Sequence, residues 1–377
     1  MSFAVPPIPP GIVCAADYEA EARQHMDAAA WAYLSGGSAD ELTLRWNREA
    51  FDRLRLRGRV LAGMDGANTR LDLLGAALEH PVLVAPMAFH RLAHPGGEAA
   101  TALGAAAVGA GLVVSTQSSV PVEEVAAQHA AGGGRAPLWF QLYPQHDRGF
   151  TRALIQRAEA AGCTALVLTV DAPVSIRNRE ARAGFALPPG IEAVHLRGLP
   201  PAPPNRAGMA ESAVFRGMLD AAPTWRDLEW LRAGTRLPIL LKGVTDPEDA
   251  LRAAGEGMAG IVLSNHGGRA LDTLPATIDL LPPMAERLGG QLPILLDGGI
   301  RRGTDIVKAL ALGAKAVLVG RPVLHALAVG GPVGVAHLLK ILRTELEAAM
   351  ALTGCRNLTA IGPEEIWRGG FRLSPPG

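Results

Sequence analysis

The sequence predicts a closed barrel of eight parallel strands, each followed by a helix, and three observations lead to this α/β fold class, the (β/α)8 or TIM barrel. The chain has 377 residues, which fits one barrel of roughly 250 residues with insertions. Short and almost wholly apolar segments recur eight times, as parallel strands buried on both faces require. A helical pattern separates these segments, and polar residues stand where each of them ends.

Residues 15–60 have a helical pattern and precede the barrel, which we place at about residues 80–330. No basic region followed by an apolar core opens the sequence, so we expect no signal peptide. We expect a single domain over residues 1–377, because no second set of elements stands apart from the barrel.

The eight predicted strands begin after the N-terminal helical segment. They are PVLVAP (81–86), GLVVST (111–116), LWFQLY (138–143), ALVLTVD (165–171), PILLKGV (238–244), GIVLSNHG (260–267), PILLDGG (293–299) and AVLVGRP (316–322). Helical candidates such as GEAATALGAAAVGA lie between them and end in glycine, which is a typical helix stop signal. An open doubly wound sheet is the alternative, but its first strand should lead into a Gly-rich fingerprint, and APMAFH stands there instead.

Two further segments complete the chain. A stretch rich in proline, residues 187–223, separates the fourth and fifth strands, and a loop of this length at a barrel mouth is expected to be a substrate lid or disordered. The stretch GVAHLLKILRTELEAAMALTG is expected to form one long helix near the end of the chain.

Composition narrows the class of protein. Hydrophobic residues make up 49% and charged residues 19%, and the formal net charge is zero, so neither nucleic acid nor an anionic membrane is an expected partner. No long unbroken apolar run suggests a membrane span. The three cysteines match no zinc or redox spacing, so we expect reduced thiols, no metal site and a cytoplasmic location.

Polar residues stand at the ends of all eight apolar strands, which is where the catalytic groups of a barrel gather. A ring of polar side chains at the mouth of an apolar tube indicates a bound polar ligand. The strand ends carry Met87, Ser115, Gln141, Tyr143, Thr169, Asp171, Lys242, Ser264, His266, Asp297, Gly298, Gly299, Gly320 and Arg321.

The last two strand ends predict a phosphate site. Gly298 and Gly299 open the loop DGGIRRG, where backbone N–H groups and a helix N-terminus can face an anion, and Arg321 follows the eighth strand. Simple turn glycines and solvated arginines are the alternative. Lys242 would stabilise an anion formed beside it, or else pair with Asp171 or Asp297.

The stretch SNHGGRALD, residues 264–272, carries the candidate chemistry. His266 supplies a base near neutral pH, and Arg269 can hold a carboxylate with two hydrogen bonds. Asp171 could orient the imidazole and raise its basicity. An isolated core histidine is the alternative, but the arginine, the acidic residue and the phosphate site favour a catalytic group.

With these motifs the chain resembles the FMN-dependent 2-hydroxy-acid oxidases and dehydrogenases, among them the glycolate, lactate and hydroxymandelate oxidases and the flavin domain of flavocytochrome b2. SNHGGR-x-LD is the signature of that family, and FQLY, LTVDAP, LPILLKGV, DGGIRRGTDI-x-KALALGA and GRPV follow its blocks in order. The resemblance implies a barrel that binds FMN and oxidises a 2-hydroxy acid, usually the L form, to the 2-oxo acid. O2 is the expected electron acceptor, and a quinone or another acceptor is the alternative.

The resemblance also implies roles for individual residues. It implies that His266 is the base and Asp171 its orienting partner, and that Arg269, a second arginine, Tyr33 and Tyr143 bind the substrate. Whether the base takes the hydroxyl proton during hydride transfer or the Cα proton stays open. The implied FMN ligands are Pro86, Met87, Ala88, Ser115, Gln141, Thr169, Lys242, Ser264, Asp297, Gly298, Gly299, Arg301, Gly320 and Arg321.

Four departures from the family pattern bear on the substrate. The stretch after the fourth strand is one residue shorter than usual, which puts the second arginine at Arg177, with Arg179 as the alternative. Gln117 stands where glycolate oxidases have a tryptophan, and the segment 187–223 holds no tyrosine. Met87 and Phe89 form a bulky apolar wall, so a hydrophobic side chain on the substrate is expected.

Two other classes of protein remain at this stage. One is a different FMN- or phosphate-binding barrel enzyme, resembling dihydroorotate dehydrogenase or isopentenyl diphosphate isomerase, which would lack the His-Gly-Gly-Arg run. The other is a catalytically inactive barrel that serves as a binding scaffold. The family resemblance further implies a homo-oligomer, a tetramer or an octamer.

Overall fold

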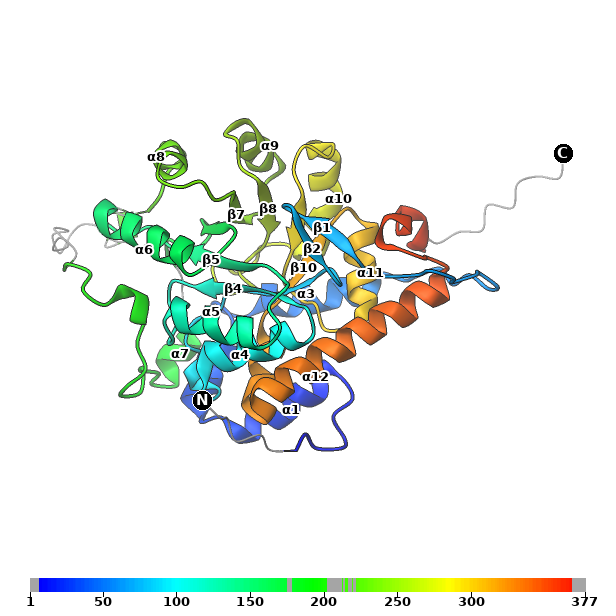
Figure 1. The fold of residues 1–377 in the computed structure, drawn as a ribbon, viewed down its shortest axis with the longest axis horizontal. Helices are drawn as coiled ribbons and strands as arrows, with labels where there is room; N and C mark the ends of the chain where they lie inside the picture. The colour runs from blue at the N-terminus through cyan, green and yellow to red at the C-terminus, as the bar shows by residue number, and fades with distance from the viewer. Residues whose placement is uncertain are drawn as a thin grey trace.

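The computed structural model describes residues 7–174, 178–201 and 222–367, together with residues 212, 214, 215 and 219. Eight parallel strands close into a barrel, because β10 pairs with β3 as well as with β9 (Figure 1). The strands are β3 (Val82–Val84), β4 (Gly111–Ser115), β5 (Leu138–Leu142), β6 (Leu166–Thr169), β7 (Ile239–Val244), β8 (Gly260–Leu263), β9 (Ile294–Leu296) and β10 (Ala316–Val319). Each overlaps one predicted segment, so the barrel is confirmed and the open sheet was the wrong alternative.

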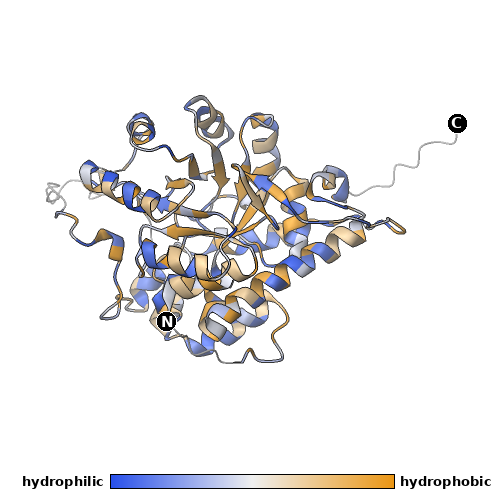
Figure 2. Cartoon of the chain, in the orientation of Figure 1, coloured by the Kyte–Doolittle hydropathy of each residue, from blue (hydrophilic) through white to orange (hydrophobic). Residues whose placement is uncertain are grey.

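Helices surround the barrel, and the apolar strands lie inside this ring (Figures 1 and 2). They are α4 (Gly97–Ala107), α5 (Val122–Ala131), α6 (Arg148–Ala160), α7 (Asn178–Arg182), α8 (Asp227–Ala233), α9 (Pro247–Gly255), α10 (Thr277–Leu288), α11 (Gly303–Ala311) and α12 (Arg321–Thr353). Gly162 and Gly313, just beyond α6 and α11, have φ of 89° and 113°. These values are left-handed, so the predicted glycine stop signal is confirmed at both helices.

The segment before the barrel contains three helices and one hairpin. α1 (Ala15–His25), α2 (Ala28–Ser35) and α3 (Leu42–Arg53) confirm the helical pattern. The hairpin of β1 (Leu71–Leu73) and β2 (Ala76–Leu78) was not predicted, because strands of three residues are too short to show a period.

The interior of the barrel is filled by side chains. Leu83, Val113 and Trp139 are among the inward residues, and Leu73 and Leu78 of the hairpin belong to the same cluster. The barrel is therefore a packed core, and a site can form only at its mouth.

Helix α12 is long and apolar. Its most apolar window has a mean hydropathy of 1.5, so it could cross a membrane by length and composition alone, which the sequence reading overlooked. In this fold 78% of that window is buried inside the molecule, as in a core helix. Its φ/ψ angles are not helical at Gly330 and Gly331, so the predicted C-terminal helix is the part that follows this kink.

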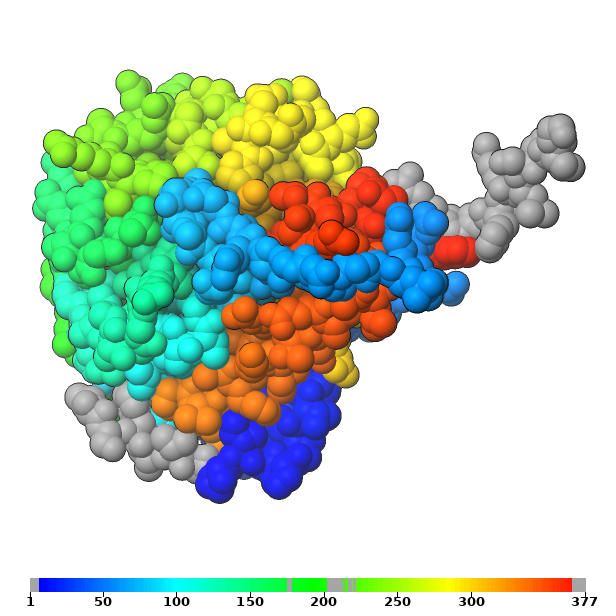
Figure 3. Space-filling view, turned by 45° about the vertical axis from the view of Figure 1, so that its right-hand side comes forward, coloured from blue at the N-terminus to red at the C-terminus, as the bar shows by residue number. Residues whose placement is uncertain are grey.

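The segment 54–68, which follows α3, packs against the C-terminal part of the described chain. The segment 54–68 lies across the last turns of α12, where the backbone N–H of Arg59 donates to the carbonyl of Leu352 at 2.9 Å (Figure 3). Short 3-10 turns lie at His90–Leu92, Val194–Leu196, Leu358–Ala360 and Pro363–Glu365. Within the predicted lid, residues 202–211 lie outside the described residues, and Val194 donates from its backbone to the carbonyl of Ser118 at 3.0 Å.

Candidate active site

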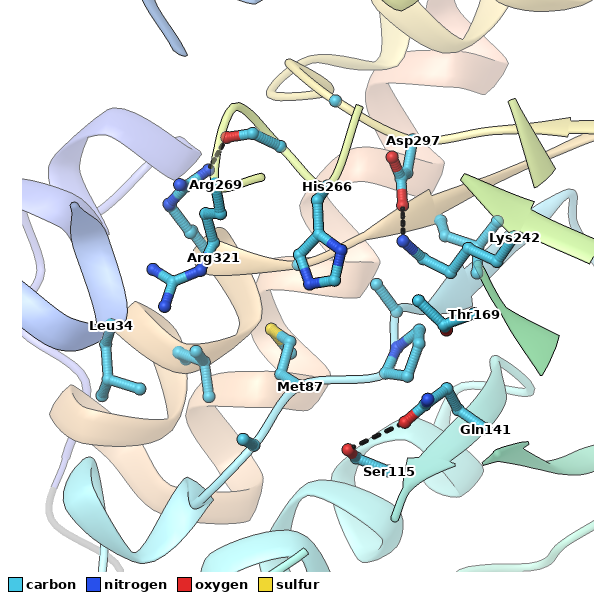
Figure 4. A pocket seen from close by; sticks show the side chains of 18 of the residues that line it. Leu34, Met87, Ser115, Gln141, Thr169, Lys242, His266, Arg269, Asp297 and Arg321 are labelled. Carbon is cyan, nitrogen blue, oxygen red and sulfur yellow. Dashed lines mark hydrogen bonds and ion pairs between the residues drawn. The ribbon is translucent and has the colours of Figure 1, made fainter. Parts of the chain in front are cut away.

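A pocket with about 970 Å³ of empty space lies where the strands end (Figure 4). This volume includes space that is open to solvent, as expected for a site at the mouth of a barrel. The predicted site residues that line it are Tyr33, Pro86, Met87, Ala88, Ser115, Gln141, Tyr143, Thr169, Lys242, His266, Arg269, Asp297, Gly298, Gly299, Arg301, Gly320 and Arg321. Asp171 and Ser264 are not lining residues but contact ones that are, and Arg177 lies outside the described residues.

His266 points into the pocket from the loop after β8 (Figure 4). Its Nδ1 lies 2.8 Å from Oδ1 of Asp171, whose side chain is 8% exposed. Burial acts to raise the pKa of Asp171, but His266 and Lys242 outweigh it and hold that pKa below its ordinary value. The carboxylate is an acceptor, so Nδ1 carries the hydrogen and Nε2 is left to take a proton.

Gly243 lets Asp171 reach the histidine, and the sequence reading missed it. Its φ is 101°, and a Cβ built on it would lie 2.3 Å from the Cβ and Cγ of Asp171. The pairing of β7 with β8 shifts register at this residue, next to Lys242. A glycine inside an apolar strand is a signal for such a bulge, and it was present in the run LLKGV.

The loop that carries His266 holds an unusual backbone conformation. His266 has φ of 57°, and Gly267 and Gly268 after it have φ of 61° and 75°. A side chain with positive φ costs on the order of 1–3 kcal/mol, so the surrounding contacts must hold it. The Oγ of Ser264 accepts the backbone N–H of His266 at 3.0 Å, and a Cβ on Gly268 would lie 2.6 Å from the backbone nitrogen of Leu44 in α3.

Lys242 lies at the end of β7 and is almost fully buried. Its Nζ donates to the Oγ of Ser264 at 2.9 Å and pairs with Oδ2 of Asp297 at 3.1 Å. Burial alone would lower the pKa of Lys242, but Asp297 and Asp171 outweigh it and hold that pKa above its usual value. The lysine is therefore a fixed cation, and of the two ion pairs that the sequence suggested for it, the one with Asp297 is present.

Two buried arginines, Arg301 and Arg321, line the pocket next to Arg269. Burial, with Arg269 and Arg301 nearby, lowers the pKa of Arg321 to about 9, and burial also lowers the pKa of Arg301. Within the described residues neither Arg301 nor Arg321 forms an ion pair. Arg321 donates only to backbone carbonyls, those of Gly267 at 2.9 Å and Gly36 at 2.8 Å. Buried cations in this arrangement are stabilised by a bound anion such as a phosphate.

Several buried polar atoms of the site have no hydrogen-bond partner among the described residues. They are Nε2 of Gln141, Oγ1 of Thr169, Oδ1 of Asp297 and Nε of Arg321. Gln141 is oriented, because its Oε1 accepts from Ser115 Oγ at 3.0 Å. Unpartnered buried polar atoms are costly unless a ligand meets them. Together with the arginines they fit FMN, which offers a polar ring edge, a ribityl chain and a phosphate.

Gly298 and Gly299 have a second role beyond the predicted backbone approach to a phosphate. A Cβ on Gly298 would lie 2.9 Å from Thr277 Oγ1, and one on Gly299 would collide with the backbone of Asn47 in α3. The φ values of 91° and 94° also exclude most side chains. These glycines therefore let α3 pack against the loop after β9.

The predicted substrate residues Arg269 and Tyr33 line the pocket beside Arg321, and both Arg269 and Arg321 donate to the carbonyl of Gly36. Arg269 donates from Nη1 to the carbonyls of Tyr33 at 2.6 Å and Gly36 at 3.0 Å, and its guanidinium lies 5.3 Å from the centroid of the Tyr33 ring. Arg179, the alternative second arginine, pairs with Glu41 at 3.1 Å and is 44% exposed.

Some residues that line the pocket were not among the predicted site residues. They are Leu34, Ala85, Gly267, Ile300, Leu318 and Leu324. None is polar, so none stood out against an apolar strand or helix. Gln117, noted there as a departure from the family pattern, also lines the pocket.

Comparisons with known proteins agree with this geometry. The family model described as FMN-dependent dehydrogenase matches residues 22–368. The chain is 48% identical to an L-lactate oxidase of Nostoc sp. over 92% of this chain and 95% of that protein. It is 42% identical to glycolate oxidase 1 of Zea mays over 95% of this chain and 96% of that protein. A solved structure of mandelate oxidase with (S)-2-phenylpropionate superposes with a TM-score of 0.84 at 40% identity, covering 94% of this chain and 98% of the other.

Proposed function

Because this chain belongs to the FMN-dependent dehydrogenase family, we propose that it oxidises an L-2-hydroxy acid to the 2-oxo acid and passes the electrons to O2. It is an FMN-dependent oxidoreductase, as its relatives are. The observation that carries the proposal is the pairing of His266 with Asp171 at 2.8 Å in a pocket that also holds Arg269, Lys242 and Arg321. Neither a different phosphate-binding barrel nor an inactive scaffold accounts for this set.

Two groups of residues in the pocket have different proposed roles. Arg301 and Arg321 would hold the FMN phosphate, and the unpartnered atoms of Gln141, Thr169 and Asp297 would meet the ring and the ribityl chain. Pro86, Met87, Ala88 and the loop glycines would line the same ligand. When bound, FMN supplies an acceptor for the electron pair that leaves the substrate and transfers it to O2.

Carboxylate binding falls to Arg269. Its Nη1 is fixed by two backbone carbonyls, so the guanidinium is oriented before the substrate arrives. A fixed planar donor can hold a carboxylate in one orientation, which places the carbinol carbon for reaction. Tyr33 and Tyr143 line the same region, and Arg177 is the proposed second arginine, with Arg179 as the alternative.

Proton removal falls to Nε2 of His266. Asp171 holds the other ring nitrogen and stabilises the imidazolium that forms. Lys242 would stabilise negative charge that develops on the bound cofactor, and it would do so without moving, because Ser264 and Asp297 hold its ammonium group. Oxidation of the hydroxy acid to the 2-oxo acid removes two protons and two electrons, and His266 would take one proton. The electron pair would pass to bound FMN, either together with the second hydrogen as a hydride or, if His266 takes the Cα proton, with the hydroxyl proton lost separately.

We propose an apolar side chain on the substrate. Leu34, Met87 and Ala88 are apolar residues that line the pocket, and the first two are labelled in Figure 4. Lactate and mandelate, the acids after which two of the relatives are named, have apolar side chains, which supports this choice. L-lactate is the first substrate to test.

The test is an anaerobic spectrum of the yellow protein. Loss of the oxidised flavin bands on addition of L-lactate, glycolate or mandelate supports the proposal, and admission of air should restore them with one H2O2 per substrate. Flavin that is reduced by a 2-hydroxy acid but is re-oxidised only by a quinone would make the protein a dehydrogenase. Flavin that stays oxidised with all three acids would refute the proposal.

We also propose a cytoplasmic homo-oligomer, with a tetramer as the first arrangement to test. Val60 and Leu61 are 87% and 101% exposed on the segment that lies against α12, and Leu352 beside them is 70% exposed. Apolar side chains gathered in this way support a contact with a second copy. All three cysteines are free and buried, which suits a reducing compartment.

A further inference from the structure

The short helix α7 brings a carboxylate of the protein onto the arginine of the proposed substrate site. Nη2 of Arg269 lies 3.2 Å from Oε1 of Glu180, and the two side chains are only 16% and 12% exposed. No motif at the sequence level indicated this contact, because the two residues are 89 positions apart.

A second contact from the same turn lands on the neighbouring substrate residue. The ring of Phe185 stacks on Tyr33 with centroids 4.3 Å apart and 14° between the planes. The backbone N–H of Phe185 donates to the carbonyl of Glu180 at 3.0 Å, so the carboxylate and the ring belong to one folded turn. This turn therefore contacts two of the residues assigned to the substrate, Arg269 and Tyr33.

We propose that Glu180 is a resident carboxylate, which occupies Arg269 in the free enzyme and must be replaced by the carboxylate of the substrate. This inference rests on the proposed function, because it is a competition for the proposed substrate arginine. Nη1 of Arg269 donates to the carbonyls of Tyr33 and Gly36, and Nη2 donates to Glu180, so a substrate carboxylate that uses Nη2 meets the same edge as Glu180. One edge cannot bind two carboxylates in the same place, because like charges repel.

The competition sets substrate affinity without entering the chemical step. A ligand that binds only the open arrangement has its affinity reduced by the fraction of molecules that are open. At saturation the substrate has already displaced Glu180, so kcat should not depend on it. A neutral ligand is not expected to displace Glu180, because it would leave the buried guanidinium of Arg269 without a negatively charged partner.

The test compares two variants of the flavin-loaded protein, Glu180→Gln and Glu192→Gln. Each removes one negative charge from the chain after β6, but Glu192 pairs with the exposed Arg197, which lines no part of the pocket. Pyruvate is the probe, and its dissociation constant is read from the change in the flavin absorption spectrum. We expect Glu180→Gln to bind pyruvate about tenfold more tightly, since a neutral amide competes less well than a carboxylate, and Glu192→Gln to match the wild type.

Steady-state rates with L-lactate add a second measurement, in which KM should fall in Glu180→Gln while kcat stays the same. Weaker or unchanged pyruvate binding in that variant would overturn the inference and make Glu180 a residue that orients Arg269. If Glu180→Gln fails to hold flavin, Glu180→Ala takes its place. Failure of the proposed function is distinct, because the wild-type flavin would then stay oxidised with every 2-hydroxy acid.

Discussion

The loop after β8, residues 264–272, and the turn 178–185 around α7 both contact the substrate end of the pocket, but they are held in opposite ways. The first is fixed by buried bonds to α3. Asn265 and Asn47 exchange amide hydrogen bonds of 2.9 and 2.8 Å, and Asp272 accepts the backbone N–H of Thr43 at 2.8 Å. The carboxylate of Asp272 thereby caps the start of α3 from another part of the chain.

The turn 178–185 has no fully buried residue. Its described contacts with the pocket are the ion pair of Glu180 with Arg269 and the stack of Phe185 on Tyr33. The ion pair is largely buried, but a ligand carboxylate can replace Glu180 on Arg269 because it supplies the same charge. The comparison teaches that the proton-transfer groups are fixed before the substrate binds, whereas the cover over the carboxylate site is exchangeable.

The largest expected effect concerns the arginine that both regions share. Replacing Arg269 by methionine should lower kcat/KM with L-lactate by about 10³-fold, because the carboxylate loses a partly buried charged partner. Rapid-mixing measurements of flavin reduction at several lactate concentrations would show the loss. Arg197→Met, at an exposed arginine of the segment 187–223, should change kcat/KM little. Equal losses of kcat/KM in both variants would contradict a specific carboxylate site.

The next largest effect concerns the proposed phosphate site at Arg321. Arg321→Met should weaken FMN binding by about 10²-fold, as expected for loss of a buried charge-assisted contact with phosphate. Riboflavin, which has no phosphate, should bind the variant and the wild type about equally. Fluorescence titration of the apoprotein with both ligands measures this, and an equal loss for riboflavin would move the phosphate away from Arg321.

Gly243 offers a smaller but more local test. Alanine there should displace Asp171 from His266 and slow flavin reduction by about tenfold, since small misplacements of catalytic groups are costly. Gly162→Ala is the matched control, because Gly162 also has a left-handed φ, 89°, but a Cβ there meets nothing within 4 Å. Both variants should lose stability in urea because of the left-handed φ, and Gly243→Ala should lose more because its Cβ overlaps Asp171. Equal rates of flavin reduction would refute the positioning role of Gly243.

The smallest effect is on acid stability. The pKa of Asp171 is lowered in the fold, so its ionised form contributes stability above the ordinary carboxyl range, and this is lost as the pH falls through the lowered value. The difference in unfolding free energy between the wild type and Asp171→Asn should therefore be constant from pH 5 to 6 and shrink below about pH 4. Urea titrations at each pH measure it, and a constant difference down to pH 3 would contradict the stabilisation of the Asp171 carboxylate by His266 and Lys242.

The sequence predicted the barrel well because buried parallel strands leave a strong signal. Runs such as LPILLKGV are apolar on both faces, and polar residues at their ends mark the mouth. The hairpin of β1 and β2 left no such signal, and α12 was read as less apolar than it is. His266, Lys242 and Arg321 could be predicted because each is a polar residue at the end of an apolar strand.

Some contacts between distant parts of the chain could not be predicted. Glu180 lies on a polar stretch where one more carboxylate is unremarkable, and its partner Arg269 is known only once the chain has folded. Leu34 and Leu324 reach the pocket from helices and resemble any other core leucine. Asn47 and Gly243 act through the backbone and side chains of other residues, which periodicity does not reveal.

The central claim is that Nε2 of His266, held by Asp171, is the base of the reaction. The most direct measurement is anaerobic rapid mixing of L-lactate with flavin-loaded wild type and His266→Gln. We expect the variant to keep its flavin and to be reduced at least about 10³-fold more slowly, since general bases contribute 10²–10⁴-fold. Reduction of His266→Gln at the wild-type rate would contradict the account.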